Sequence, residues 1–281
     1  MDELDNNKLK AEDDEREVES EENQRGEEIE VNEDRLPSRA MAIHEHIRQE
    51  GEKEMERDAL ALLWSAIAAG LSMGASFIIV IMARQQLFTE NTVTAVLPVM
   101  HNPTLGNVGL LMRLWSVVLA GNLIGTAVAA WAFNYMPIFD EPTRQAFVSI
   151  AEDVMKNSPT EMFANAIISG WLVATMVWMF PVAGAAKIVV IILMTWLIAL
   201  ADTTHIVVGS VEILYLVFNG NLPWSDFIWP FALPTLAGNI CGGTFIFALL
   251  SHAQIRNDMS SKRKAEARAQ AAEKGKKADR A

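Results

Sequence analysis

The stretch that decides the fold runs from Ile188 to Phe218 and reads IVVIILMTWLIALADTTHIVVGSVEILYLVF. It is long enough to cross a membrane, because about 20 apolar residues span a hydrocarbon core of about 30 Å. Near its middle, Ala201-Asp202-Thr203-Thr204-His205 interrupts the apolar run with an acid, two hydroxyls and an imidazole. Ionisable groups at bilayer depth usually face a cavity or pathway, and a helix broken there usually lines one. The stretch therefore predicts an all-α integral membrane protein that works as a channel or transporter.

Charged residues divide the chain into parts. Residues 1–58 hold 22 of the 35 acidic residues against 9 Lys and Arg, whereas residues 59–250 hold 9 acidic and 5 basic residues. Residues 251–281 hold 4 acidic and 9 basic residues. This pattern predicts an acidic disordered cytoplasmic tail at 1–40, an amphipathic cytoplasmic helix at 41–58, a transmembrane channel domain at 59–252 and a basic cytoplasmic tail at 253–281.

Basic residues flanking the apolar part predict its orientation, because Lys and Arg favour the cytoplasmic side of a membrane. Such residues precede the first apolar segment and follow the last: Arg48, Lys53, Arg57, Lys262-Arg263-Lys264 and Arg268. Both termini are therefore expected to be cytoplasmic. The chain contains no nucleotide-binding loop and no catalytic nucleophile motif, so we expect no enzymatic activity, no cofactor and no nucleic-acid partner.

Two seven-residue segments match each other closely, LAGNLIG at 119–125 and LAGNICG at 236–242. Small residues at this spacing let membrane helices approach closely, and Asn can hydrogen-bond across them. The expected helix-packing positions are Gly121, Asn122, Gly125, Gly238, Asn239 and Gly242. The match is either two ordinary packing faces or an internal repeat. The surroundings favour a repeat, because Ala66-Ile67-x-x-Gly70 resembles Ala166-Ile167-x-x-Gly170.

The two copies also have polar breaks at corresponding places, which is typical of inverted-repeat transport folds. Thr89 lies 33 residues before Asn122, and His205 lies 34 residues before Asn239. The copies differ in length upstream of these breaks. The second covers 69 residues from position 170 to 239, and the first covers only 52 residues from position 70 to 122.

Three motifs together resemble the formate/nitrite transporter family: QLFTENT at 86–92, the two Gly-Asn-x-x-Gly copies, and Asp202-Thr-Thr-His205. The resemblance covers about residues 40–260, and a divergent bacterial inner-membrane branch of the family is most similar. It implies a homopentamer of six-helix protomers in a bacterial inner (plasma) membrane. Each protomer would have its own pore and an aquaporin-like inverted repeat, in which the second and fifth helices are broken by loops that meet near the middle of the pore.

Measured against that family, the chain lacks about 25–30 residues between about Ser76 and Phe77, within the first repeat. We expect the end of the first helix to be joined to the end of the first half of the second. Such a fused span leaves five crossings where six are expected, which conflicts with two cytoplasmic termini. An incomplete pore wall would also put transport itself in doubt.

The resemblance maps His205 onto the family's pore histidine and Thr89 onto the threonine of the opposite loop that bonds it. Asp202 and Thr204 complete the expected pore and substrate residues. A buried imidazole can donate a hydrogen bond to an anion and exchange a proton near neutral pH. The alternative is a structural histidine bonded to Thr203 or to a carbonyl group.

Other positions are expected to shape or weaken the pore. Leu87, Phe88 and Ile198 are expected to form apolar constrictions, with ordinary packing as the alternative. A lysine and an asparagine common in the family fall at Ser158 and Ala174 here, which should weaken the attraction of anions.

These observations predict a channel for small monovalent anions or their neutral acids, with the lipid bilayer and further copies of the chain as partners. An aquaporin-like pore for a small neutral solute is one alternative, and a non-transporting membrane scaffold is another. A metal-dependent enzyme built on Asp202 and His205 is disfavoured, because metal sites generally need three or four ligands. No metal site is therefore expected.

Overall fold

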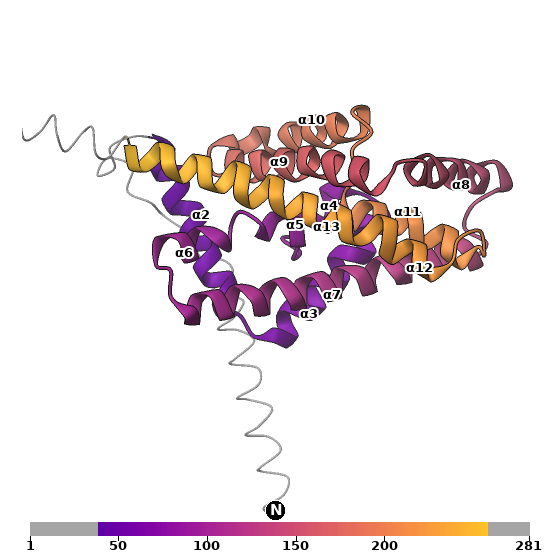
Figure 1. Ribbon diagram of the computed structural model, residues 1–281, viewed down its shortest axis with the longest axis horizontal. Helices are drawn as coiled ribbons and strands as arrows, with labels where there is room; N and C mark the ends of the chain where they lie inside the picture. Colours follow the sequence, from indigo (N-terminus) through magenta and orange to yellow (C-terminus); the bar gives the residue numbers. More distant parts are fainter. Residues whose placement is uncertain (1–38, 258–281) are drawn as a thin grey trace, which may run out of the picture. The chain divides into compact units, whose positions relative to one another are not determined.

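The computed structural model describes residues 39–257, so most of the two predicted tails, 1–40 and 253–281, lies outside the described residues. Within residues 39–257 the regular structure is helical, without strands (Figure 1). The helices are α2 (Arg39–Glu56), α3 (Ala59–Met73), α4 (Phe77–Met82), α5 (Phe88–Asn91), α6 (Val96–His101), α7 (Leu105–Tyr135), α8 (Glu141–Met155), α9 (Pro159–Ala183), α10 (Lys187–Leu200), α11 (Ile206–Phe218), α12 (Trp224–Asp226) and α13 (Leu233–Ile240). A π-helical turn at Phe227–Ala232 joins α12 to α13. A second π-helical turn at Cys241–Ala248 joins α13 to the last helical segment, which continues to Asn257.

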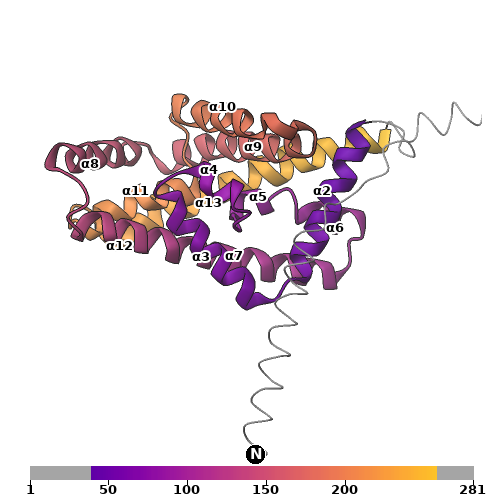
Figure 2. The ribbon, with the colours of Figure 1, turned by 180° about the vertical axis from the view of Figure 1, so that it is seen from behind.

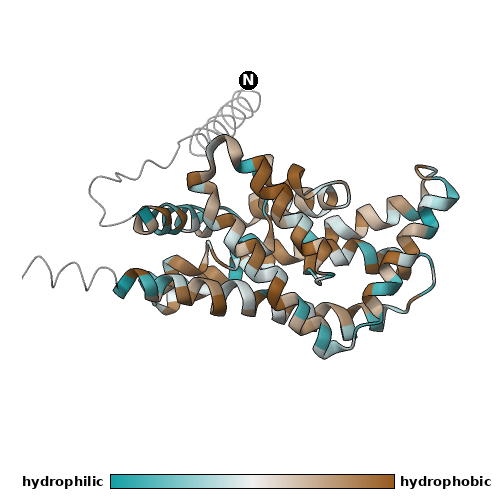
Figure 3. Cartoon of the chain, turned by 90° about the horizontal axis from the view of Figure 1, so that it is seen from above, coloured by the Kyte–Doolittle hydropathy of each residue, from teal (hydrophilic) through white to brown (hydrophobic). Residues whose placement is uncertain are grey.

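Within residues 39–257, three apolar helical stretches are long enough to cross a membrane: Leu105–Tyr135, Pro159–Leu200 and Trp224–Asn257. Figure 3 shows the apolar residues distributed along these helices. The 42-residue stretch is two elements, because Gly184 adopts a positive φ of 48° after α9 and α10 folds back along α9. Ala59–Met73 and Ile206–Phe218 are apolar but shorter. The predicted all-helical membrane architecture is confirmed.

The two sequence copies pack in the same way against the first helix of their own repeat. An added Cβ at Gly121 would lie 2.5 Å from Ala66 Cβ, and one at Gly238 would lie 2.6 Å from Ala166 Cβ. Real Cβ atoms do not approach this closely, so both crossings require glycine. The α3–α7 and α9–α13 pairs are therefore equivalent contacts, as expected for an internal repeat.

The repeated asparagines tie each break to these crossings. Asn122 Nδ2 donates to Ala66 O at 2.8 Å, and its Oδ1 accepts from Phe88 N at 2.9 Å. Asn239 Nδ2 donates to Ala166 O at 2.8 Å, and its Oδ1 accepts from Ile206 N at 2.9 Å. Each buried amide thus satisfies the backbone where the chain resumes its helix after a break.

The first repeat is shorter than the second in two elements. Helix α3 has 15 residues where α9 has 25, and α4 has 6 residues where α10 has 14. The expected fused span is not formed, because a turn at 74–76 separates α3 from α4. Ser76 is extended there, and its Oγ caps α4 by accepting from Ile78 N at 3.2 Å.

After α4 the chain returns towards α2, where α3 began. Helix α6 lies beside α2 in both views of the ribbon, and a Cβ added at Gly51 of α2 would collide with Thr94 O (Figures 1 and 2). The first half is thus a re-entrant hairpin that starts and ends on the α2 side.

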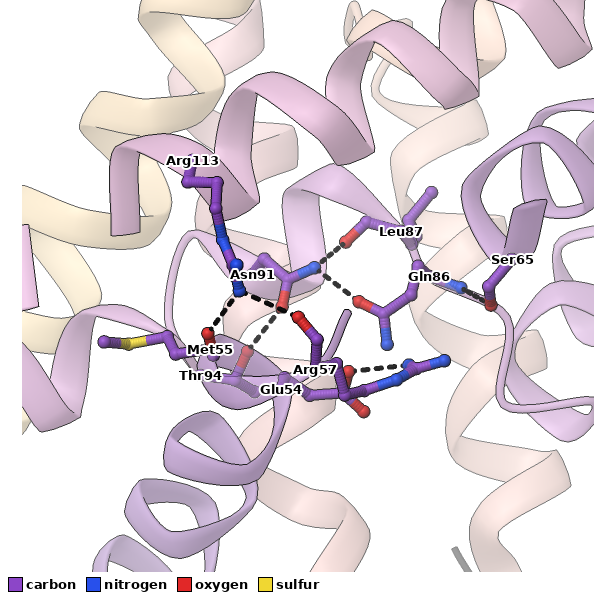
Figure 4. Close-up of polar contacts among 9 residues, drawn as sticks. All are labelled: Glu54, Met55, Arg57, Ser65, Gln86, Leu87, Asn91, Thr94 and Arg113. Carbon is purple, nitrogen blue, oxygen red and sulfur yellow. Dashed lines mark hydrogen bonds and ion pairs between the residues drawn. The ribbon is translucent and has the colours of Figure 1, made fainter. Parts of the chain in front are cut away.

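One turn of α7 contacts both α2 and the first break, and Figure 4 shows the contact with the end of α2. Arg113 Nη2 donates to the carbonyl oxygens of Met55 and Arg57, at 2.8 Å each, at the C-terminal end of α2. A cation there also complements the negative end of the helix dipole. Two residues further on, Trp115 Nε1 donates to Asn91 O at 3.0 Å.

Candidate functional site

The two breaks meet at a buried pair of side chains. Thr89 Oγ1 lies 2.9 Å from His205 Nε2, and both residues are buried. Thr89 is in α5, at the break of the first repeat, and His205 immediately precedes α11. The structure therefore brings together the two residues that sequence analysis placed on opposite loops.

The surroundings of His205 determine where its proton lies. Its Nδ1 accepts from Val207 N at 3.2 Å and from Val208 N at 3.3 Å, so the imidazole caps the N-terminus of α11. A nitrogen that accepts cannot carry a proton, so the hydrogen is on Nε2 and points to Thr89 Oγ1. The alternative bond to Thr203 is not formed, because Thr203 Oγ1 donates to Ile198 O.

Thr204 fastens the second break to α9. Its Oγ1 donates to Met162 O at 2.8 Å, and its carbonyl oxygen accepts from Ser169 Oγ. Ser169 Oγ in turn accepts from Asn239 Nδ2 at 2.9 Å. The Thr204 hydroxyl is thus engaged with backbone rather than turned to His205. Ser169 was missed by sequence analysis, although it directly precedes Gly170 of the repeat.

A second polar network shapes the first break (Figure 4). Asn91 Nδ2 donates to Gln86 Oε1 at 3.0 Å and to Leu87 O at 3.2 Å. Thr94 Oγ1 donates to Asn91 Oδ1, and Gln86 N donates to Ser65 Oγ of α3. These residues hold the loop that presents Thr89. Gln86 and Asn91 belong to the QLFTENT motif, which was their only sequence signal.

Asp202 lies apart from the pair. It is exposed, has a positive φ of 49° and donates its N–H to Ala199 O, so it ends α10. Within residues 39–257, Asp202 is not among the hydrogen-bond partners of His205. The amino group of Lys187 lies over the Phe180 ring, 4.4 Å from the ring centroid. Asp202 instead acts electrostatically on Glu212 of α11.

The expected constriction residues differ in environment. Leu87 and Phe88 are fully buried, and the Phe88 ring packs edge-on against Trp115. Ile198 is partly buried in α10. The aromatic ring beside His205 is instead Phe77 of α4, edge-to-face with 6.0 Å between ring centroids. Phe77 was missed because it stands where the first repeat is shortened.

Comparison with known proteins agrees with this geometry. A family model described as "Formate/nitrite transporter" matches residues 74–253. The chain belongs to the formate/nitrite transporter family. Inner membrane protein YfdC of Escherichia coli (strain K12) is 75% identical over 296 residues, covering 95% of this chain and 96% of that protein. A pentameric formate channel with formate bound is similar in fold, with a TM-score of 0.59, 20% identity, and coverage of 70% of this chain and 97% of that one.

The comparison with the E. coli relative also bears on the length of this family member. Ninety-five per cent of 281 residues is about 267, so about 29 of the 296 aligned positions have no residue in this chain. That shortage agrees with the short α3 and α4. The family match begins at residue 74, at the turn between these two helices.

Charged groups act on the residue that follows Thr89. Glu90 directly follows Thr89, and Glu50 and Glu54 of α2 act electrostatically on its carboxyl group, as does Lys187. Ser158 and Ala174, which stand where the family commonly has a lysine and an asparagine, have structural roles here. Ser158 Oγ caps α9 in a capping box, and Ala174 is buried. Lys156 pairs with Asp153 on the surface.

Proposed function

We propose that this chain forms a pore for small monovalent weak-acid anions, which cross as their neutral acids. The proposal places it in a bacterial inner membrane as a homopentamer with cytoplasmic termini. The observation that carries it is the His205–Thr89 pair, held between the breaks of two inverted repeats. Membership of a transporter family, the E. coli inner membrane relative and the pentameric formate channel of similar fold support it.

The geometry suggests how the pair acts on such a solute. The Nε2–H group and the Thr89 hydroxyl are donors that a carboxylate oxygen can accept from. Protonation of Nδ1 would break its two bonds to the α11 backbone, so His205 works as a neutral donor. An anion is costly to desolvate and its neutral acid is not, so the anion takes up a proton from hydronium ions of the bulk solution before it crosses.

A pore for a neutral solute is the second candidate. The acidic side chains of Glu50 and Glu54 act electrostatically on that of Glu90, and none of the three offers positive charge to an anion. Ser158 and Ala174 supply no opposing cation. Neither candidate assigns an enzymatic activity or a nucleic-acid partner, in keeping with membership of a transporter family.

Flux of formate into liposomes between pH 5 and 8 tests the proposal with two matched threonines. Thr89→Val removes the partner of His205, whereas Thr203→Val removes a hydroxyl that donates to Ile198 O, near the end of α10. Loss of one buried hydrogen bond in the path is worth about tenfold in rate. We expect Thr89→Val to slow formate flux about tenfold and Thr203→Val to leave it within about twofold.

The pH profile separates the two candidates. Flux that rises as the pH falls supports passage of the acid, whereas pH-independent flux of glycerol or urea with no formate flux supports a neutral solute. Equal effects of the two threonine substitutions, in protein that remains folded and oligomeric, would contradict a role for the pair.

A further inference from the structure

Three of the five histidines gather away from the pore centre, and each comes from a different element. His44 is on α2, His252 is near the end of the last helix, and His101 ends α6. His44 Nε2 faces His252 Nδ1 at 3.4 Å, and their ring centroids are 5.5 Å apart. His101 lies close enough to act electrostatically on both. Sequence analysis could not connect them, because 208 positions separate His44 from His252.

The separation of the facing nitrogens fits metal coordination better than a direct hydrogen bond. Good hydrogen bonds from ring N–H groups are mostly shorter than about 3.2 Å. Two imidazole nitrogens, each about 2.0–2.1 Å from a tetrahedral zinc ion, are about 3.3–3.4 Å apart. The observed 3.4 Å thus matches the spacing of two ligands on one ion.

Packing fixes the position of the His44 ring. His44 is buried, with the ring of Trp178 edge-on at 6.1 Å between centroids. Its Nε2 is thereby held where it faces His252 Nδ1.

The neighbouring charges indicate which ions fit. The guanidinium group of Arg48 acts electrostatically on His44, and that of Arg256 acts on His252. Both positive charges would repel a cation that was bound by electrostatic attraction alone. Glu45, the nearby acid, already accepts hydrogen bonds from Arg48. Mg²⁺ and Ca²⁺ need oxygen ligands, whereas Zn²⁺, Ni²⁺ and Cu²⁺ bind imidazole nitrogen.

We propose that His44 and His252 form a two-histidine seat for a borderline transition-metal ion that joins α2 to the last helix. No three His, Cys, Asp or Glu side chains in residues 39–257 form a complete metal centre, so water completes the coordination shell. The ion is therefore exchangeable, and its binding does not require that the pore conduct.

Binding of Zn²⁺ and Ni²⁺ by the purified full-length oligomer, carrying a tag without histidine, tests the seat by equilibrium dialysis. His44→Ala and His252→Ala are each expected to weaken binding at least tenfold. His46→Ala is the matched control, because His46 is on the same helix two residues away and outside the pair. It is expected to change affinity less than twofold, and Mg²⁺ is expected not to bind.

The proposal is overturned if the ions bind equally to the wild type and to both variants, or if His46→Ala abolishes binding. A measurement on the wild type alone covers the case in which a variant does not assemble. With one equivalent of Cu²⁺ per chain, electron paramagnetic resonance should show coupling to two imidazole nitrogens. Coupling to one nitrogen or none contradicts the seat.

Discussion

At the scale of single residues, His205 has two separable duties. Its Nδ1 caps α11 and its Nε2–H meets Thr89, so one ring both completes a helix and supplies a donor to the other break. Asn is among the best N-cap residues, and its side-chain oxygen can replace Nδ1 as the acceptor. It is too short to place a donor where Nε2 lies.

Two substitutions at this position therefore separate stability from flux. We expect His205→Ala to lower the free energy of unfolding by about 1 kcal/mol relative to His205→Asn, because alanine leaves the first amides of α11 without a cap. Both variants should lose most formate flux. Thermal unfolding in detergent and liposome flux measure the two effects, and a His205→Asn protein with wild-type flux would refute the donor role.

Residue-scale prediction from sequence worked where a side chain had a repeat partner or a family motif. His205 and Thr89 had both, and their contact was expected. Phe77 had neither, because the apolar run from Ala59 to Met82 contains no charge or proline to mark the turn. Asp202 was placed by its position in sequence, yet its positive φ makes it a helix terminator.

At the scale of helices, the two crossings tolerate no side chain at their closest points. A Cβ on Gly121 meets Ala66 Cβ at 2.5 Å and Leu63 O at 3.0 Å, and both atoms belong to packed helix α3. Gly109, on the same helix α7, has nothing within 4 Å of its Cβ position. The LAGN copies were recognisable because this close approach restricts both helices to small residues.

The two glycines make a matched pair of substitutions. Gly121→Ala should separate α7 from α3 and lower the free energy of unfolding by about 1–3 kcal/mol, the usual cost of overpacking. Gly109→Ala should raise it by up to about 1 kcal/mol through the higher helix propensity of alanine. Thermal unfolding of both variants checks this, and similar shifts in the same direction would rule out the close crossing.

At the scale of the whole molecule, the shortened first repeat leaves the second without a full counterpart. Helix α10, which contacts the six-residue α4, buries only Ile191 of its 14 residues, whereas α11 buries nine of 13. The sequence revealed the shortage through the repeat spacing. It did not reveal that α3 and α4 form a re-entrant hairpin, because that depends on the capped turn at Ser76.

Restoring the missing segment tests how the shortened first repeat affects stability and formate flux. Insertion of the extra residues of YfdC between Ser76 and Phe77 should cover α10, raise the midpoint of thermal unfolding and increase formate flux severalfold. An insertion of equal length made of Gly and Ser is the control and should do neither. Unchanged flux with the native insertion would mean that the short hairpin already closes the pore wall.

The hydrogen bonds of Arg113 and Trp115 have a mechanical consequence. These side chains lie two residues apart on α7, and they hold the end of α2 and the carbonyl of Asn91, two positions beyond Thr89. A force that pulls α2 away from the membrane domain is therefore applied to the same helical turn that supports the first break. The end of α2 and the loop that carries the Thr89 hydroxyl are therefore mechanically coupled through a single turn of α7.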